Sequence, residues 1–404
     1  MCIIAFITNC CERFPFVLIN NRDELLDRFT HPLALDPATG LLWAVDGVAG
    51  GSWLGINVFS GRLATVTNCR RVPSAPLMGR PVTATGWRGA APLEESLRYT
   101  TVAKAVGVDG VERKTLVYDP PTSRGTIIKE FLHGGDLPRV DGTCGTGVPP
   151  SLQPPYYAGY NLLTCESVFG KPPGKDTTPF SMEYTSNRFY APHRQTAQNS
   201  TVHCLQNTFI DNWAEPKSRL LRDLFQEQLD RTLLPLRAGQ AVDAKAVASQ
   251  FADHCLCAQP NFDLLADVRR LEGLSEKSET AEKELHDLRE LLHSTNPFSG
   301  FTKSELENHF KLSPSDYADS FDEKKISHDV LKEAYLQKNI FVPAQANYGT
   351  EMQSMVLVER QPGCEALPIV HFLQRRVQNR ENEPVQFDKW VHYTIVGKTV
   401  ELVE

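Results

Sequence analysis

The sequence predicts an α+β fold, and three observations support this class. Short apolar runs typical of strands lie near both ends of the chain, helical periodicity begins only in the middle, and no GxGxxG-type phosphate loop occurs. Strands and helices that are segregated along the sequence favour α+β over an alternating, doubly wound fold. The chain of 404 residues is long enough for one large domain or two ordinary ones, and we expect a single domain over residues 1–404.

The first seventy residues or so predict two antiparallel strand pairs. Cys2–Thr8 and Phe16–Asn20 are continuous apolar runs, as expected for strands that are buried on both faces. The polar residues between them allow a hairpin. Ser52–Asn57 and Arg62–Thr67 form the second predicted pair, joined by a turn at Ser60-Gly61.

Further strands are predicted on both sides of the middle region. Lys114–Asp119 and Gly125–Leu132 continue the apolar pattern around Pro120-Pro121, before two loop-rich stretches at 134–155 and 170–179. Near the C-terminus, the sequence predicts strands at three places: Ile340-Phe341-Val342, Ser354–Glu359 and Trp390–Val396.

Helices are predicted between these two groups of strands. Lys217–Leu229 carries one apolar stripe, and Asp263–Leu271 is a second predicted helix. Glu276–His293 is strongly charged with few apolar positions, which indicates an exposed helix on the surface. The polar stretch at about 272–338 is interpreted as an insertion that packs peripherally.

Composition excludes several classes of function. A net charge of −7 and a pI near 5.9 argue against a nucleic-acid-binding protein. No apolar run approaches the roughly 18–20 residues that span a bilayer, and the short apolar start lacks a basic leader, so we expect no transmembrane segment and a cytoplasmic location. His254-Cys255-Leu256-Cys257 resembles half a metal site without a second half, so no metal site is predicted.

Cys2 is the most informative residue of the chain. It directly follows Met1, and methionine is usually trimmed before a small residue. A first-residue cysteine would carry a thiol and an α-amine on one Cα, so that one residue could serve as both nucleophile and base. The alternative is a small buried hydrophobic residue at the start of a strand.

A polar group, Asn20-Asn21-Arg22-Asp23-Glu24, follows the second strand. The hairpin would bring these residues back toward Cys2. There the cation of Arg22 would favour the thiolate, and the carboxylate of Asp23 could hold and orient the α-ammonium group. The alternative is an ordinary solvated ion pair.

Short motifs of this chain resemble those of the NRDE family, which is associated with transport and Golgi organization. They occur in order over nearly the whole chain, apart from the polar stretch at about 272–338. The motifs are Met1-Cys2-Ile3-Ile4-Ala5-Phe6, Asn21-Arg22-Asp23-Glu24, Gly50-Gly51-Ser52-Trp53-Leu54-Gly55-Ile56, Thr65-Val66-Thr67-Asn68, Ser123-Arg124-Gly125 with Phe131-Leu132, Gly159-Tyr160-Asn161-Leu162, Leu205-Gln206-Asn207, Ile340-Phe341-Val342-Pro343 and Tyr348-Gly349-Thr350.

The family is in turn similar to N-terminal-nucleophile hydrolases, especially the penicillin and bile-salt amidases. This resemblance implies a four-layer αββα sandwich with Cys2 as nucleophile, Asp23 and Arg22 beside it, and Asn68 and Asn207 as polar groups for the intermediate and the amine. We therefore expect Cys2, Asp23, Asn68 and Asn207 to converge on one pocket. Strand-end asparagines are also common as turn or capping residues. The residues that the resemblance assigns to ligand binding are Asn20, Asn161 and Tyr348.

Two functions follow from the resemblance. The first is a ligand-binding protein of secretory and Golgi organisation, handling haem, a lipid or an acyl-CoA-like molecule, with association with the Golgi or mitochondria. The alternative is a cysteine amidase or thioesterase. Two departures from the family pattern weaken catalysis: the amidases have arginine where this chain has Asn20, and many family members have arginine where it has Glu351. No cofactor is required, and haem is considered only as a ligand, held by a cysteine or histidine.

Overall fold

The computed structural model describes most of the chain in segments. The described residues are 2–69, 100–106, 112–118, 122–135, 157, 159–169, 180–186, 193–213, 215–237, 239–259, 270–282, 285–286, 303–308, 310–317, 339–344, 347–360 and 367–403. The predicted loops at 134–155 and 170–179 fall almost entirely outside them.

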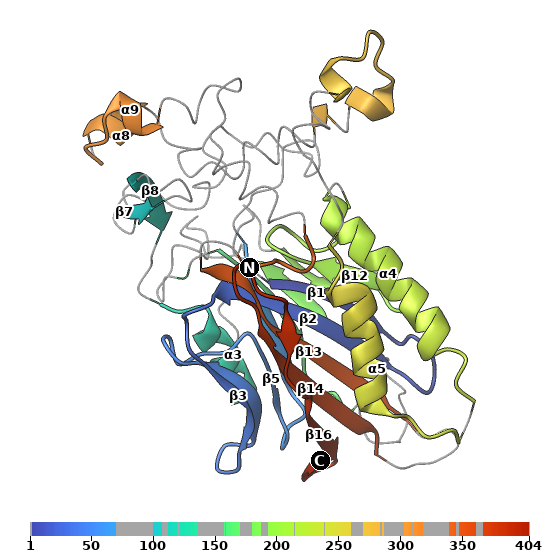
Figure 1. Cartoon of the computed structure of the whole chain (residues 1–404). Coiled ribbons are helices and arrows are strands. Elements are labelled where there is room, and N and C mark those ends of the chain that lie inside the picture. Colours follow the sequence, from blue (N-terminus) through green and yellow to red (C-terminus); the bar gives the residue numbers. More distant parts are fainter. Residues whose placement is uncertain are drawn as a thin grey trace, which may run out of the picture.

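The first sheet has eight strands and contains both ends of the described chain (Figure 1). Its main order is β12-β1-β2-β13-β14-β16-β17, with β15 paired to β14. All its pairs are antiparallel, and the predicted hairpin of the first two strands is confirmed. The strands are β1 (Cys2–Thr8), β2 (Phe16–Leu25), β12 (Val202–Leu205), β13 (Tyr348–Glu359), β14 (Ile369–Gln378), β15 (Gln386–Phe387), β16 (Val391–Val396) and β17 (Thr399–Val403).

Among the described residues, the second sheet has seven strands in the order β11-β10-β9-β6-β5-β4-β3. The predicted pairing of β5 with β6 is confirmed. A separate hairpin is formed by β7 (Thr100–Val106) and β8 (Glu112–Tyr118). The strands of the second sheet are β3 (Thr30–Asp36), β4 (Leu41–Asp46), β5 (Leu54–Asn57), β6 (Leu63–Asn68), β9 (Tyr160–Cys165), β10 (Glu183–Ser186) and β11 (His193–Thr196).

Helices cover one face of the first sheet. α4 (Pro216–Thr232) and α5 (Ala244–Phe251), which continues into the π-helical η2 (Ala252–Leu256), lie along this face in Figure 1. The predicted stripe of α4 is confirmed, because Leu221, Phe225 and Leu229 are buried against alternate residues of β1. Those β1 residues are Ile3, Ala5 and Ile7.

The opposite face of the first sheet packs on the second sheet. Ile4 and Phe6 of β1 share one apolar core with Leu54 and Ile56 of β5. α3 (Gly125–Leu132) packs on β5 and β6 of the second sheet. The protein is therefore a mixed α and β structure built mainly of antiparallel sheets, as the α+β prediction required.

The prediction of a strand at Gly125–Leu132 was wrong, because this segment is helix α3. Its buried residues are Ile127, Ile128, Phe131 and Leu132, which recur at helical spacing. An apolar run of this length does not distinguish a buried strand from one face of a short helix.

The prediction of a strand at Ile340-Phe341-Val342 was also wrong, although the segment is buried. Side chains and isolated backbone contacts form hydrogen bonds with its backbone groups in place of a strand ladder, such as that from the Phe341 N–H to the Ala258 carbonyl. The Val342 N–H donates to Thr350 Oγ1 at 2.8 Å, and the Ile340 carbonyl accepts from Asn21 Nδ2 at 2.9 Å. A buried segment that is not hydrogen-bonded into a sheet has the same apolar sequence pattern as a buried strand.

Only part of the polar stretch at about 272–338 belongs to the described residues. Its described residues include α8 (Lys303–Asn308) and α9 (Pro314–Tyr317), which lie beside the β7–β8 hairpin in Figure 1. Lys114 Nζ is 3.0 Å from Asp316 Oδ2 and joins α9 to β8. Most of the predicted helix Asp263–Leu271, and much of Glu276–His293, lie outside the described residues.

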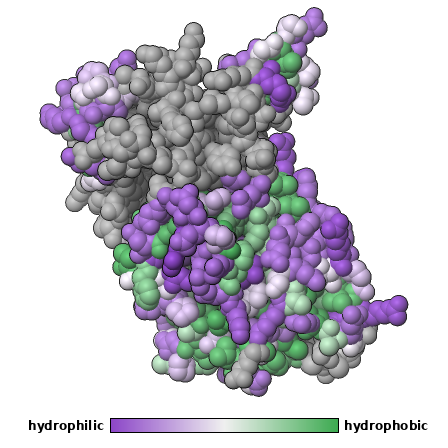
Figure 2. Space-filling model, viewed as in Figure 1, coloured by the Kyte–Doolittle hydropathy of each residue, from purple (hydrophilic) through white to green (hydrophobic). Residues whose placement is uncertain are grey.

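The surface in Figure 2 is largely hydrophilic over α4 and α5, with hydrophobic residues scattered between. Within the described segments, no helix is long and apolar enough to cross a membrane.

A buried histidine pair predicts acid sensitivity. His371 Nδ1 and His392 Nε2 are 3.1 Å apart, and burial, followed by the nearby His371 and Lys245, lowers the pKa of His392 to about 4. Between about pH 6.5 and pH 4, His392 is therefore protonated in the unfolded chain but neutral in the folded chain. Stability should be full above about pH 6.5 and fall toward pH 4, by on the order of 2 kcal/mol. Urea titrations at pH 7 and 4.5 measure this loss in the free energy of unfolding. In the His392→Gln variant, the free energy of unfolding should depend less on pH.

Candidate functional site

Cys2 opens β1, which lies between β12 and β2 in the first sheet. On one side it pairs directly with Arg22 of β2. On the other side the β1–β12 ladder runs from Ile7↔Val202 to Ile4↔Leu205. That ladder ends two residues short of Cys2 and Asn207. The backbone thus places the predicted nucleophile directly opposite the predicted cation, Arg22.

Successive residues of β2 point to opposite faces of the sheet. Arg22 points toward the second sheet, where its guanidinium stacks on the Trp53 ring with 4.6 Å to the centroid. Asn21 points toward the helices and donates from Nδ2 to the Leu256 carbonyl at 2.8 Å. By this alternation Asn20 shares the face of Arg22, and Asp23 shares the face of Asn21.

Arg22 is held in a buried ion network. Its side chain is 4% exposed and pairs with Glu351, with Asp46 at 3.0 Å, and with Glu24 at 3.8 Å. Burial raises the pKa of Glu351, and the positive charge of Arg22 partly offsets this. The cation beside Cys2 is therefore neutralised by carboxylates of the protein.

A β-bulge explains how Glu351 reaches Arg22. The register of β13 on β2 shifts between Thr350 and Met352, so Glu351 is the extra residue. Thr350 points to Asp23, whereas Glu351 and Met352 both face the second sheet. Glu351, where many family members have arginine, is therefore the partner of Arg22.

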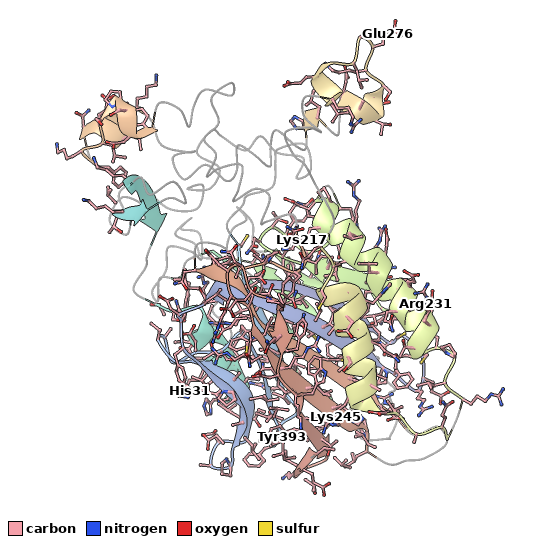
Figure 3. The ribbon with its side chains drawn as sticks, in the orientation of Figure 1. His31, Lys217, Arg231, Lys245, Glu276 and Tyr393 are labelled. Atoms are coloured by element: carbon pink, nitrogen blue, oxygen red, sulfur yellow. The ribbon has the colours of Figure 1, made fainter. Side chains whose placement is uncertain are left out.

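Asp23 is buried on the helix-facing side of β2. Thr350 Oγ1 donates to its Oδ1 at 2.7 Å. Burial raises the pKa of Asp23, and the positive charges of Lys217 and the amino terminus act in the opposite direction. Figure 3 shows Lys217 at the end of α4 nearest the N-terminus. The positive charges of Lys217 and of the amino terminus thus act on the same buried carboxyl group, Asp23.

The Cys2 thiol is held in its neutral form. Burial is the main cause that raises its pKa, and the charge of Asp23 adds to it. The amino terminus and Arg22 lower the pKa without reversing the shift. In the chain that retains Met1, Cys2 is therefore a half-buried thiol and not a preformed thiolate.

The predicted asparagines Asn68 and Asn207 meet at the ends of β6 and β12. Asn207 Nδ2 donates to the Asn68 carbonyl at 2.9 Å. Asn161 of β9 lies behind them, fully buried, and donates from Nδ2 to the carbonyl of Gln206 at 3.1 Å and to that of Thr208. Tyr184 Oη donates to Asn161 Oδ1 at 2.9 Å. Asn161 thus fixes the loop that carries Asn207.

The other two predicted ligand-binding residues surround the β2 backbone. Tyr348 opens β13, and its hydroxyl donates to the Asp23 carbonyl at 3.0 Å. Asn20 is fully buried and donates from Nδ2 to the Ile3 carbonyl at 3.3 Å. Among the described residues, Asn20 Oδ1 and Trp53 Nε1 are buried polar atoms without a hydrogen-bond partner.

Sequence reasoning missed Lys217 as a site residue. It is 1% exposed, although lysine is rarely buried unless paired. A signal was present: Lys217, Leu221, Phe225 and Leu229 follow one another at intervals of four, so the lysine occupies the apolar stripe. The charge balance of Arg22 with Glu351 was also missed, because 329 residues separate them in sequence.

The described parts of the chain contain no group of three or more His, Cys, Asp or Glu side chains that could hold a metal ion. What the site offers is a thiol, amide groups and balanced charges at one end of β1. These groups can contact a polar ligand, and the thiol can attack an acyl group once it is deprotonated.

Comparison with known proteins supports the NRDE resemblance at the start of the chain. Residues 1–89 match the family model described as Transport and Golgi organisation 2. The match includes Cys2, Arg22, Asp23 and Asn68 and confirms the recognition over this part of the chain. No curated protein matches the sequence significantly.

Proposed function

Taking the Transport and Golgi organisation 2 match as the premise, we propose that the protein serves secretory and Golgi organisation from the cytoplasm by binding a small lipid or acyl-CoA-like molecule at Cys2. The observation that carries the binding proposal is that Asn20 Oδ1 and Trp53 Nε1 are among ten buried side-chain polar atoms of the described residues that lack a hydrogen-bond partner. Buried polar atoms are normally hydrogen-bonded. A ligand with a carbonyl and an N–H or hydroxyl group would satisfy both.

The charges around Cys2 also support binding. Arg22 is already neutralised by Glu351 and Asp46, so the site offers little net charge for stabilising an oxyanion. The neutral Cys2 thiol is a weak nucleophile. A neutral acyl group fits these surroundings better than an anionic one.

Haem fits this site less well. A cysteine ligates haem iron as the thiolate, and burial favours the neutral thiol of Cys2. A neighbouring cation that could stabilise a thiolate, Arg22, is already paired. We therefore prefer the lipid or acyl-CoA class.

The second candidate is a cysteine amidase or thioesterase of the N-terminal-nucleophile type. The order of the layers supports it. The helices α4 and α5 pack on the first sheet, the first sheet packs on the second, and α3 packs on the second sheet, which is the layer order of an αββα sandwich. The placement of Asp23 beside the amino terminus also supports it. In this mechanism Cys2 would need Met1 removed, so that its own amine accepts the thiol proton.

The test combines intact mass with binding. A long-chain acyl-CoA is added to the wild type, Cys2→Ala and Cys2→Ser, and both the covalent mass and the affinity are measured. Binding alone predicts that Cys2→Ala retains affinity within roughly tenfold, about 1.4 kcal/mol, and that no acyl adduct forms. Cys257→Ala is the matched control, because Cys257 is another half-buried thiol with a raised pKa.

The alternative makes the opposite prediction. An acyl adduct on Cys2 with turnover that Cys2→Ala abolishes, in a chain whose mass shows that Met1 is removed, would establish the hydrolase instead. If neither the wild type nor the variants bind the acyl-CoA, the proposed ligand class is wrong.

A further inference from the structure

Cys2 begins a row of residues that crosses four strands of the first sheet. Arg22 of β2 lies directly opposite Cys2. Met352 of β13 lies opposite Arg22, and Arg376 of β14 lies opposite Met352. Residues that are directly opposite in antiparallel strands share a face of the sheet. Because neighbouring strands lie about 4.8 Å apart, Arg376 is three strand spacings, or roughly 14 Å, from Cys2 along this row.

The row faces the second sheet and reaches solvent again at Arg376. Arg22 and Met352 are buried, whereas the side chain of Arg376 is 41% exposed. Arg22 lies under β3, an edge strand of the second sheet as described, because its Nη1 donates to Thr30 Oγ1 at 3.2 Å. Arg376, two strands further along the row, is therefore accessible to a ligand in solution.

The guanidinium of Arg376 is only partly neutralised by the protein. Among the described residues it contacts one carboxylate, that of Glu351, with Nη2 3.4 Å from Oε1. The same carboxylate is in closer contact with Arg22, and its side chain is 2% exposed. A guanidinium has five N–H donors, so this single long contact leaves the exposed edge of Arg376 available for an anion.

We propose that Arg376 binds the phosphate of a ligand whose acyl group lies at Cys2, and that this ligand is an acyl thioester with its phosphate on a long spacer. The inference rests on the proposed function, which places the acyl group at Cys2. Arginine binds phosphate through two parallel N–H donors. The separation of roughly 14 Å between Cys2 and Arg376 sets the spacer. A phosphopantetheine arm can span it, whereas a lysophospholipid carries its acyl and phosphate groups on one glycerol.

The charges along the row fit a ligand of this kind. At the Cys2 end, Arg22 is neutralised by Glu351 and Asp46, which suits a neutral acyl group. At the other end, the exposed Arg376 can pair with a phosphate that stays in contact with water, so that little hydration is lost. The two ends of the row thus differ in the group that they bind.

The test compares the dissociation constants of three palmitoyl compounds: palmitoyl-CoA, S-palmitoyl-N-acetylcysteamine, which has the thioester without a phosphate, and 1-palmitoyl lysophosphatidic acid. The wild type should bind palmitoyl-CoA roughly tenfold more tightly than the cysteamine thioester. Arg376→Gln should weaken palmitoyl-CoA roughly tenfold and leave the cysteamine thioester unchanged, because only palmitoyl-CoA offers a phosphate at the right distance. The affinity for lysophosphatidic acid should not depend on Arg376.

Arg380→Gln is the matched control. Arg380 follows Arg376 in the sequence, is 72% exposed and lies 3.6 Å from Glu383. Its replacement removes a surface arginine outside the row and should leave all three affinities unchanged. Arg376→Lys keeps the charge without the paired donors and should retain part of the affinity for palmitoyl-CoA. Arg376→Gln leaves Glu351 paired with Arg22, and circular dichroism of each variant shows that folded proteins are compared.

The inference is overturned if Arg376→Gln weakens palmitoyl-CoA no more than Arg380→Gln does, or if it weakens both thioesters equally. Equal losses for palmitoyl-CoA and lysophosphatidic acid would overturn the long spacer. These outcomes leave the proposed function standing, since the wild type still binds the thioesters. Failure of the wild type to bind either thioester contradicts the proposed function itself.

Discussion

Replacing Arg22 by methionine is expected to lower the free energy of unfolding by about 3–5 kcal/mol, as is typical when one member of a buried ion pair is removed. The substitution leaves Glu351, whose side chain is 2% exposed, with the Thr30 hydroxyl at 3.1 Å and the partly exposed Arg376 at 3.4 Å. It also removes the guanidinium from the Trp53 ring. Urea unfolding at pH 7 measures the loss.

The same network supplies a control and a rescue for this prediction. Arg28→Met removes a more exposed arginine that is 2.7 Å from the same Asp46, and should cost less than about 1 kcal/mol. Arg22→Met combined with Glu351→Leu removes both buried charges and should recover much of the stability. If the double variant is as unstable as the sum of the single ones, Arg22 and Glu351 are not coupled.

This network shows why the sequence predicted the site only in part. The hairpin of β1 and β2 follows from two apolar runs and a short polar connection, so the return of residues 20–24 toward Cys2 could be predicted, although the residue directly opposite Cys2 is Arg22 and not the expected Asp23. The partner of Arg22 could not, because Glu351 reaches it through a bulge in β13 that has no distinct residue pattern. The same is true of Lys217, which reaches Asp23 through the packing of α4 on the first sheet.

The incorrect strand predictions have a comparable origin. Periodicity records which residues are buried, and Ile340-Phe341-Val342 and α3 are both buried. Periodicity does not indicate which groups form hydrogen bonds with the backbone N–H and carbonyl groups of a buried segment. At Val342 the N–H donates to Thr350 Oγ1, and the carbonyl accepts from the Thr350 N–H and from Asn379 Nδ2, which is 37 residues away. The αββα sandwich and the roles of Asn20, Asn161 and Tyr348 in ligand binding rest on family resemblance and stay predictions.

Gly125→Ala is expected to cost about 3 kcal/mol, at the upper end of the usual range for overpacking. α3 begins at Gly125 against the backbone of the Gly51-Ser52 segment. A Cβ at position 125 would lie 2.8 Å from both the Gly51 Cα and the Ser52 nitrogen. Both are backbone atoms, so no side chain can move aside and the helix must shift away from the second sheet.

A variant at Gly50 distinguishes this steric effect from the cost of backbone strain. Gly50 has φ +67° and open space around its Cα, so Gly50→Ala should cost only the left-handed conformation, about 1–2 kcal/mol. Equal losses for the two variants would contradict the close backbone approach. Because Trp53 follows Ser52 and stacks on Arg22, a shift of α3 should also reach Cys2. Gly125→Ala should therefore accelerate maleimide labelling of Cys2, whereas Gly50→Ala should leave its rate unchanged.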